Sequence, residues 1–229
     1  MIGYYFITDA KLSRAGNVSD VRNAVKAGVK FIQYRNKCAS TREMLDEALI
    51  LRKICTKAKL IINDRVDIAL AVNADGVHLG QDDLPCNIAR KLLGKKKIIG
   101  VTVHSLKEAL AAWKQGVDYL GVSPIFTTGT KLDAGKPAGV KLIREIKKCI
   151  SIPVVAIGGI NLSNAQDVIA FGADGLCAIS AVIQKRDVKK EIEKFQNIIM
   201  RCHCEPEVRS NLIIKIASSP AAPRNDTIC

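Results

Sequence analysis

The sequence predicts an α/β fold, a single-domain (β/α)8 TIM barrel that spans residues 1–200 of the 229. Eight short apolar, β-branched runs follow one another along the chain, and stretches with helical spacing lie between them. Strands that alternate with helices indicate parallel βαβ units, and eight units in about 200 residues match a barrel at the lower end of its size range. Polar residues follow almost every run, at the barrel end where functional residues lie in this fold.

The core is expected to consist mainly of Ile, Leu, Val and Ala, because aromatic residues make up only 4% of the sequence. Such a composition suits parallel strands that are covered by helices. The predicted strands are, in order, YYFIT (4–8), FIQYR (31–35), KLIIND (59–64), GVHLG (76–80), IIGVTV (98–103), YLGVS (119–123), PVVAIGG (153–159) and GLCAIS (175–180).

Four of the intervening stretches show clear helical signals. In residues 41–57, apolar residues recur at helical spacing along one stripe. Ser105 and Glu108 predict a capping box, and Gly116 predicts the end of that helix. Residues 163–172 and 187–200 are also predicted as helices. An open doubly wound sheet is the alternative, but its usual GxGxxG turn does not follow the first strand.

The charge and composition restrict the function classes. A net charge of +13 is compatible with nucleic acid, an anionic surface or small anionic substrates. Only Lys95, Lys96 and Lys97 form a tight basic run, without interleaved aromatics, so no specific nucleic acid is expected. No apolar run approaches the roughly 20 residues of a membrane span, and Asp9 comes too early for a signal peptide. A cytoplasmic protein with reduced thiols is therefore expected, and a homo-oligomeric state is left open.

Cations follow the second predicted strand. Gln33, Arg35 and Lys37 occupy alternate positions and are expected to share one face. Arg grips phosphate with two parallel hydrogen bonds, and Lys acts as a point charge. The TTGTK segment (127–131) could add Thr128, Thr130 and Lys131 to the same polyanion site, although a solvated loop would give the same pattern.

Carboxylates end the next two strands. Asp64 and Asp83 are expected to lie close together, and two carboxylates with substrate phosphate oxygens suit Mg²⁺. The alternative is that each residue caps the helix that follows, and Asp82 is an alternative ligand to Asp83. Gly158-Gly159 and Ile179-Ser180 end the last two strands, where such barrels often bind a second phosphate.

Together these motifs resemble the thiamine-phosphate synthase family over residues 4–200. The resemblance rests on QYRNK, INDRVDIAL, GVHLGQDD, IIGVTVHS, GVSPIFTTGTK, AIGGI and AIS. It implies transfer of hydroxymethylpyrimidine from its diphosphate to thiazole phosphate, which yields thiamine phosphate and pyrophosphate.

The resemblance also implies a role for each matching residue. Pyrimidine diphosphate contacts are expected from Gln33, Arg35, Lys37, Asn63, Thr102 and Lys131, and Mg²⁺ ligation from Asp64 and Asp83. Thiazole phosphate contacts are expected from Thr128, Thr130, Gly159, Ile179 and Ser180. Arg35, Lys37, Lys131 and Thr102 would act in catalysis. Thr102 departs from the Ser that is common in the family but keeps the hydroxyl.

Two other functions remain as alternatives. A thiazole tautomerase shares this barrel and would use His104 in acid–base chemistry without a metal, whereas a lone His beside a strand end is more often structural. A non-catalytic nucleic-acid-binding protein would account for the charge. Residues 201–229 match nothing in the family pattern and are expected to form a loop-like or disordered, dispensable extension.

Overall fold

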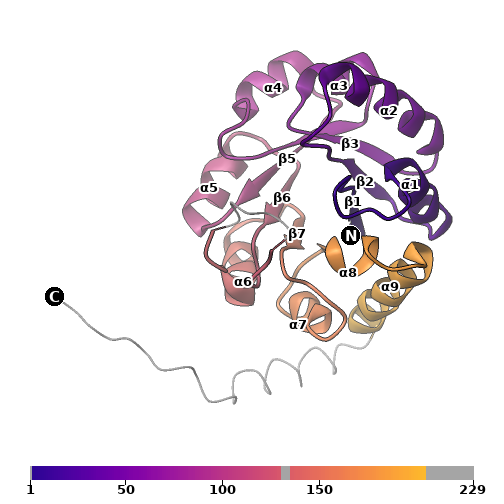
Figure 1. The fold of residues 1–229 in the computed structure, drawn as a ribbon. Coiled ribbons are helices and arrows are strands. Elements are labelled where there is room, and N and C mark those ends of the chain that lie inside the picture. Colours follow the sequence, from indigo (N-terminus) through magenta and orange to yellow (C-terminus); the bar gives the residue numbers. More distant parts are fainter. Residues whose placement is uncertain (1, 130–134, 205–229) are drawn as a thin grey trace.

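The computed structural model describes residues 2–129 and 135–204, and in these residues eight parallel strands close into a barrel in the order β1 to β8 (Figure 1). The (β/α)8 prediction is confirmed. The strands are β1 (Gly3–Ile7), β2 (Phe31–Tyr34), β3 (Lys59–Asn63), β4 (Gly76–Leu79), β5 (Ile98–Val103), β6 (Tyr119–Val122), β7 (Val154–Ile157) and β8 (Gly175–Cys177).

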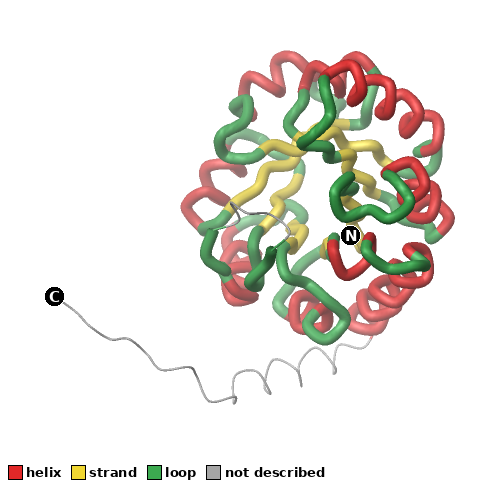
Figure 2. The backbone as a smooth tube through the Cα atoms, in the orientation of Figure 1, coloured by secondary structure: helices red, strands yellow, loops and turns green. Residues whose placement is uncertain are grey.

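The helices form a ring outside the strands (Figure 2). Each strand is followed by a helix, and β8 is followed by two. The helices are α1 (Asn17–Lys26), α2 (Thr41–Ile54), α3 (Val66–Ala71), α4 (Cys86–Leu93), α5 (Leu106–Lys114), α6 (Gly139–Cys149), α7 (Ala165–Ala170), α8 (Ser180–Ile183) and α9 (Val188–Cys204). None of these helices is long and apolar enough to cross a membrane.

The four predicted helices are confirmed, with shifted ends. Ser40 and Glu43 form a complete capping box at the start of α2. At α5 the Ser105 hydroxyl accepts the Glu108 N–H, but the Glu108 carboxylate accepts the His104 N–H instead of that of Ser105. The predicted boundary at residue 200 lies inside α9, because this helix continues to Cys204.

Apolar packing occurs on both sides of the strands. Alternate residues of β1, such as Tyr4 and Phe6, pack toward the helices, whereas Tyr5 and Ile7 belong to a smaller cluster with Tyr119. Because strand residues alternate between faces, this smaller cluster fills the barrel interior. Gln33 and His78 are buried polar residues of the barrel.

The amino-terminal ends of the strands carry a repeated polar contact. Asp75, Asp118 and Asp174 each precede an even-numbered strand. Each carboxylate accepts a backbone N–H of the preceding strand, from Leu60 (2.9 Å), Ile99 (2.7 Å) and Val154 (2.8 Å) respectively. Each also pairs with a cation on an outer helix: Arg52 on α2, Arg90 on α4 and Lys147 on α6. These contacts link alternate outer helices to the amino-terminal ends of the strands. In this fold, residues at that end usually contribute to stability and not to catalysis.

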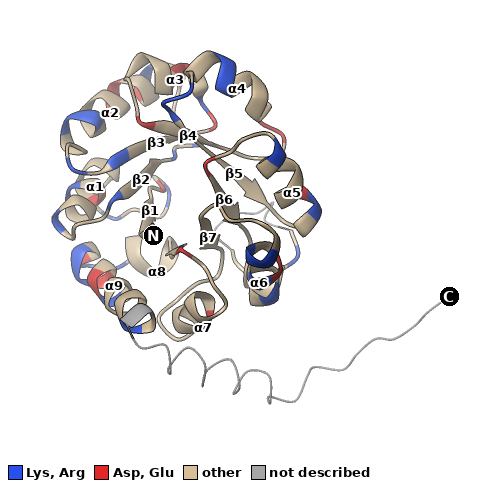
Figure 3. Cartoon of the chain, turned by 180° about the vertical axis from the view of Figure 1, so that it is seen from behind, with Lys and Arg blue, Asp and Glu red and all other residues tan. Residues whose placement is uncertain are grey.

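Lys and Arg residues are spread over the outer helices. In Figure 3 they occur on α1, α2, α4, α6 and α9, around the ring of helices. The positive net charge of this protein is therefore distributed among several outer surfaces of the barrel.

Candidate active site

A cavity opens at the carboxyl ends of the strands, the end at which the polar residues were predicted to lie. Its walls come from loops and strand ends around the whole barrel. The predicted residues that line it are Gln33, Arg35, Asn63, Thr102, Thr128, Gly159, Ile179 and Ser180. Seven further residues line it: Ile7, His78, Ser123, Ile157, Gly158, Ile160 and Cys177. Thr130 and Lys131 lie outside the described residues.

Arg35 is held at the first strand end. Strand β2 ends at Tyr34, one residue earlier than predicted, so Arg35 belongs to the following loop. Its N–H donates to the Thr8 hydroxyl at 2.8 Å, and that hydroxyl donates to the Arg35 carbonyl at 3.0 Å. Its guanidinium Nη1 lies 3.0 Å from Asp9 Oδ2. The sequence placed Thr8 at the end of the first predicted strand and Asp9 directly after it, and it assigned neither residue a role in the site.

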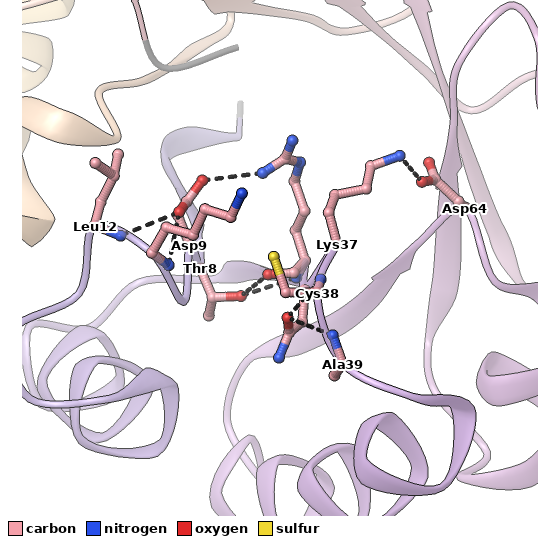
Figure 4. Close-up of polar contacts among 10 residues, drawn as sticks. Thr8, Asp9, Leu12, Lys37, Cys38, Ala39 and Asp64 are labelled. Carbon is pink, nitrogen blue, oxygen red and sulfur yellow. Dashed lines mark hydrogen bonds and ion pairs between the residues drawn. The ribbon is translucent and has the colours of Figure 1, made fainter. Parts of the chain in front are cut away.

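Lys37 points in the other direction, toward β3. Its Nζ lies 2.5 Å from Asp64 Oδ2, as the dashed line in Figure 4 shows. Between the two cations, Asn36 Oδ1 accepts the N–H groups of Cys38 and Ala39, each at 3.2 Å, and so closes an Asx turn. This loop therefore carries two cations, each paired with a carboxylate that follows a different neighbouring strand: Arg35 with Asp9 after β1, and Lys37 with Asp64 after β3.

The two predicted metal ligands lie together, and neither caps a helix. The N-cap positions of α3 and α4 are Arg65 and Pro85, without side-chain capping bonds. The Asp83 carboxylate instead accepts the Gly80 N–H at 2.6 Å. Burial raises the pKa of Asp83, the neighbouring Asp64 carboxylate raises it further, and Lys37 opposes the shift.

Asp64 has an unusual backbone conformation, with φ at 60°. Non-glycine residues are uncommon in this left-handed region, although Asp tolerates it better than most. The Asp64 N–H donates to the His78 carbonyl at 2.8 Å, which fixes this conformation against β4. Strained backbone of this kind often occurs at functional sites.

A divalent cation fits this pair of carboxylates. The Asp64 carboxylate raises the pKa of Asp83, and a cation between the two carboxylates would remove that repulsion. Within residues 2–129 and 135–204, no group of three or more His, Cys, Asp or Glu could hold a metal ion. This donor set matches Mg²⁺, which usually binds through one or two carboxylates and substrate phosphates. Asp82 is exposed, unlike Asp83.

The opposite rim of the cavity requires glycine. Gly158 and Gly159 have φ values of 99° and 65°. A Cβ on Gly159 would lie 2.5 Å from the Thr127 carbonyl oxygen, and one on Gly158 would lie 2.7 Å from Pro124 Cα. The β7 loop therefore packs directly against residues 124–127, and its backbone faces the cavity beside Ser180.

A buried network runs beneath the cavity, and no sequence pattern predicted its central residues. Gln33 Nε2 donates to the Tyr5 hydroxyl at 3.1 Å, which lies 2.7 Å from the Tyr119 hydroxyl. The Tyr119 hydroxyl lies 2.8 Å from His78 Nδ1, and His78 Nε2 lies 2.8 Å from Thr102 Oγ1. We call these five residues the Gln33–Thr102 network. Its only sequence signal was the presence of Tyr and His inside apolar runs.

His104 occupies a different place. Its side chain is exposed, its Nδ1 donates to the Ser123 carbonyl, and it does not line the cavity. His104 therefore lies outside the cavity that eight other predicted residues line.

Comparisons with known proteins agree on one family. The family model for thiamine monophosphate synthase matches residues 4–182. A thiamine-phosphate synthase of Methanosarcina mazei is 56% identical over 199 residues, which cover 86% of this chain and 83% of that protein. One of Methanosarcina barkeri is 53% identical over 201 residues, which cover 87% and 91%.

A solved structure gives the same result. The thiamine phosphate pyrophosphorylase of Pyrococcus furiosus is 43% identical and superposes with a TM-score of 0.81. The match covers 87% of this chain and 96% of that one. The chain therefore belongs to the thiamine monophosphate synthase family.

Proposed function

We propose that this protein condenses hydroxymethylpyrimidine diphosphate with thiazole phosphate and releases thiamine phosphate and pyrophosphate. The observation that carries the proposal is that one cavity at the carboxyl ends of the strands brings Arg35 and Asn63 together with Gly159 and Ser180. Arg35 and Asn63 line one side of this cavity, and the β7 glycine loop lines the other. Lys37, Asp64 and Asp83 do not line it, and they lie on the loops beside Arg35 and Asn63. This arrangement suits two phosphorylated reactants, and the names of the family relatives support the same reaction.

We assign the diphosphate of the pyrimidine substrate to the rim that carries Arg35 and Lys37. Gln33, Asn63, Thr102 and Lys131 would complete this half of the site. Both cations already have acidic partners, so they are held near the position that a diphosphate would take. Asp64 and Asp83 would hold Mg²⁺, which would supply positive charge to the leaving diphosphate.

The other rim is assigned to the thiazole phosphate. Thr128 and Ser180 would supply hydroxyl donors, as Thr130 is expected to do from the sequence, and Gly159 and Ile179 would supply backbone groups. The positive φ of Gly159 lets the backbone approach the ligand without a side chain in between. Holding the phosphate at this rim would direct the thiazole nitrogen toward the pyrimidine methylene carbon.

The charges of the site define the chemistry. The bond between the pyrimidine methylene carbon and the diphosphate oxygen breaks, and its electron pair leaves with pyrophosphate. The thiazole nitrogen then donates its lone pair to the same carbon. Arg35, Lys37 and Lys131 would stabilise the charge that grows on the departing oxygen. Orientation of the two bound reactants would lower the activation barrier of the reaction, and no side-chain nucleophile is required.

The direct test is to incubate the purified protein with both substrates and Mg²⁺ and to measure thiamine phosphate. We expect product formation that EDTA abolishes and that added Mg²⁺ restores. Absence of product from intact substrates would overturn the proposal. An isomerisation of a thiazole substrate that ignores EDTA would instead establish the tautomerase.

A further inference from the structure

We propose that Tyr119 and His78 are positioning residues that fix how Gln33 and Thr102 face the cavity, and that they thereby set the selectivity for an aminopyrimidine ring. This inference rests on the proposed function and deepens it. Gln33, His78 and Thr102 line the cavity, whereas Tyr5 and Tyr119 do not. The two tyrosines therefore act on a ligand only through their neighbours in the Gln33–Thr102 network.

The network has one consistent direction for its protons. Burial raises the pKa of Tyr5 and of Tyr119, so both phenols keep their single proton. Tyr5 accepts from the Gln33 amide, and its other contact is the Tyr119 hydroxyl, so the proton of this fully buried phenol goes to Tyr119. Tyr119 then donates to His78 Nδ1. A neutral imidazole with an acceptor at Nδ1 carries its proton at Nε2.

The last link decides the role of Thr102. His78 Nε2–H donates to Thr102 Oγ1, so the Thr102 hydroxyl keeps its proton for the cavity. At the other end, the Gln33 amide nitrogen is engaged by Tyr5, so the Gln33 carbonyl oxygen remains to accept from a ligand. The cavity floor therefore offers one acceptor at Gln33 and one donor at Thr102, and the network couples the two.

This pattern is complementary to an aminopyrimidine. An exocyclic amino group donates to the Gln33 oxygen, and a ring nitrogen or phosphate oxygen accepts from Thr102. In an analogue with an oxo group in place of the amino group, the oxo oxygen would face the Gln33 carbonyl oxygen. Both atoms are acceptors, so no hydrogen bond forms between them. Sites built to hydrogen-bond a substrate group discriminate strongly against an analogue that lacks it. If the network ran in the reverse direction, Thr102 would donate to His78 and the pattern would be lost.

The barrel leaves little room for another arrangement. A Cβ on Gly121 would lie 2.9 Å from His78 Cε1, and a Cβ on Gly100 would lie 2.0 Å from the Tyr119 ring. Glycine at these two strand positions therefore makes space for the His78 and Tyr119 rings. The rings of His78 and Tyr119 also contact each other, with centroids 5.4 Å apart.

The main test is Tyr119→Phe, which removes one hydroxyl that does not reach the cavity. Tyr4→Phe is the matched control, because the buried Tyr4 hydroxyl donates to the Ala178 carbonyl outside the network. The readout is the ratio of kcat/KM for the amino substrate to that for its oxo analogue. We expect Tyr119→Phe to lower this ratio about tenfold, the effect of one neutral hydrogen bond, while KM for thiazole phosphate is unchanged. Tyr4→Phe should keep the wild-type ratio.

A second measurement does not depend on turnover. Long-range ¹⁵N–¹H NMR of the ring nitrogens reports the tautomer of each of the three histidines in the chain. We expect His78 to carry its proton at Nε2 in the wild type. A proton at Nδ1, or an unchanged ratio in Tyr119→Phe, would overturn the inference. If the wild type forms no thiamine phosphate, the proposed function fails, but the His78 tautomer still decides the direction of the network.

Discussion

Lys37 and Asp64 form an ion pair between two neighbouring strand ends, with 2.5 Å between Nζ and Oδ2. The Lys37 side chain is 54% exposed, whereas that of Asp64 is 19% exposed. Exposed ion pairs contribute little to stability, so Lys37 can leave Asp64 at small cost. The same carboxylate can therefore pass from a lysine to a metal ion while Lys37 turns to a phosphate oxygen.

Asp64→Asn tests this shared role. Asn tolerates the left-handed backbone at this position, so the change removes charge and leaves the local conformation intact. We expect kcat/KM for thiamine phosphate formation to fall about 10²–10³-fold, as when one electrostatic contact to a developing charge is lost. Asp82→Asn, at an exposed neighbouring carboxylate, is the control. Equal losses in both variants would contradict the assignment of Asp64 and Asp83.

Arg35→Ala tests the stabilisation of the leaving group. The guanidinium lies at the cavity wall and is held by Asp9, so its loss should lower kcat/KM about 10²-fold or more. Arg22→Ala removes an exposed arginine from α1 and should keep wild-type kinetics. Steady-state assays with the pyrimidine diphosphate as the varied substrate measure kcat/KM for both variants and for the wild type. A wild-type rate for Arg35→Ala would contradict the role given to Arg35.

Asp75 should make stability depend on pH. Burial opposes its ionisation, but the Leu60 N–H, Arg52 and Lys59 together lower its pKa below the ordinary value. A lowered folded-state pKa means that the stabilisation is present above the unfolded-state pKa of about 3.9 and is lost as pH falls through the folded value.

The measurement is urea unfolding of wild type and Asp75→Asn. We expect Asp75→Asn to lower the free energy of unfolding at pH 7 by about 1–3 kcal/mol, because Arg52 and Lys59 lose their anionic partner, although the amide oxygen can still accept the Leu60 N–H. Near pH 3 the difference between the two proteins should shrink. A difference that stays constant with pH would show that the ionised carboxylate contributes nothing.

Gly159→Ala should damage the phosphate rim. The added Cβ would meet the Thr127 carbonyl at 2.5 Å and would occupy a left-handed conformation. We expect a lower melting temperature and a higher KM for thiazole phosphate. Gly129→Ala is the stability control, because among the described residues, apart from its chain neighbours, no heavy atom lies within 4 Å of its Cβ position. Equal melting temperatures for the two variants would contradict the packing described for the β7 loop.

The extension should be removable after α9. We expect a chain that ends at Cys204 to keep its fold and its activity. A chain that ends at Met200 would lose Cys202, which is buried in the helix–barrel core, and should melt at a lower temperature. Thermal unfolding of both truncations, together with the condensation assay, checks this. Loss of activity in the chain that ends at Cys204 would show that residues 205–229 contribute to function.

The barrel could be predicted from the sequence because its signals are local. Apolar runs such as KLIIN and helical stripes such as that of α2 reflect which faces are buried, and their alternation leaves few topologies. The residues after each strand could be assigned to one site for the same reason, since parallel strands all end at one face of the barrel.

Contacts across the barrel could not be read from the sequence. Tyr5 and Tyr119 are 114 positions apart, yet their hydroxyls are 2.7 Å apart, because closure of the sheet directs both side chains inward. The pairing of Arg35 with Asp9, and of Lys37 with Asp64, likewise depends on the positions of neighbouring loops. The sequence by itself determined the fold, the end that carries the cavity and eight of the fifteen residues that line it. Only the tertiary structure decided which side chains are partners and assembled the buried network, because these contacts depend on distances between side chains that no local pattern encodes.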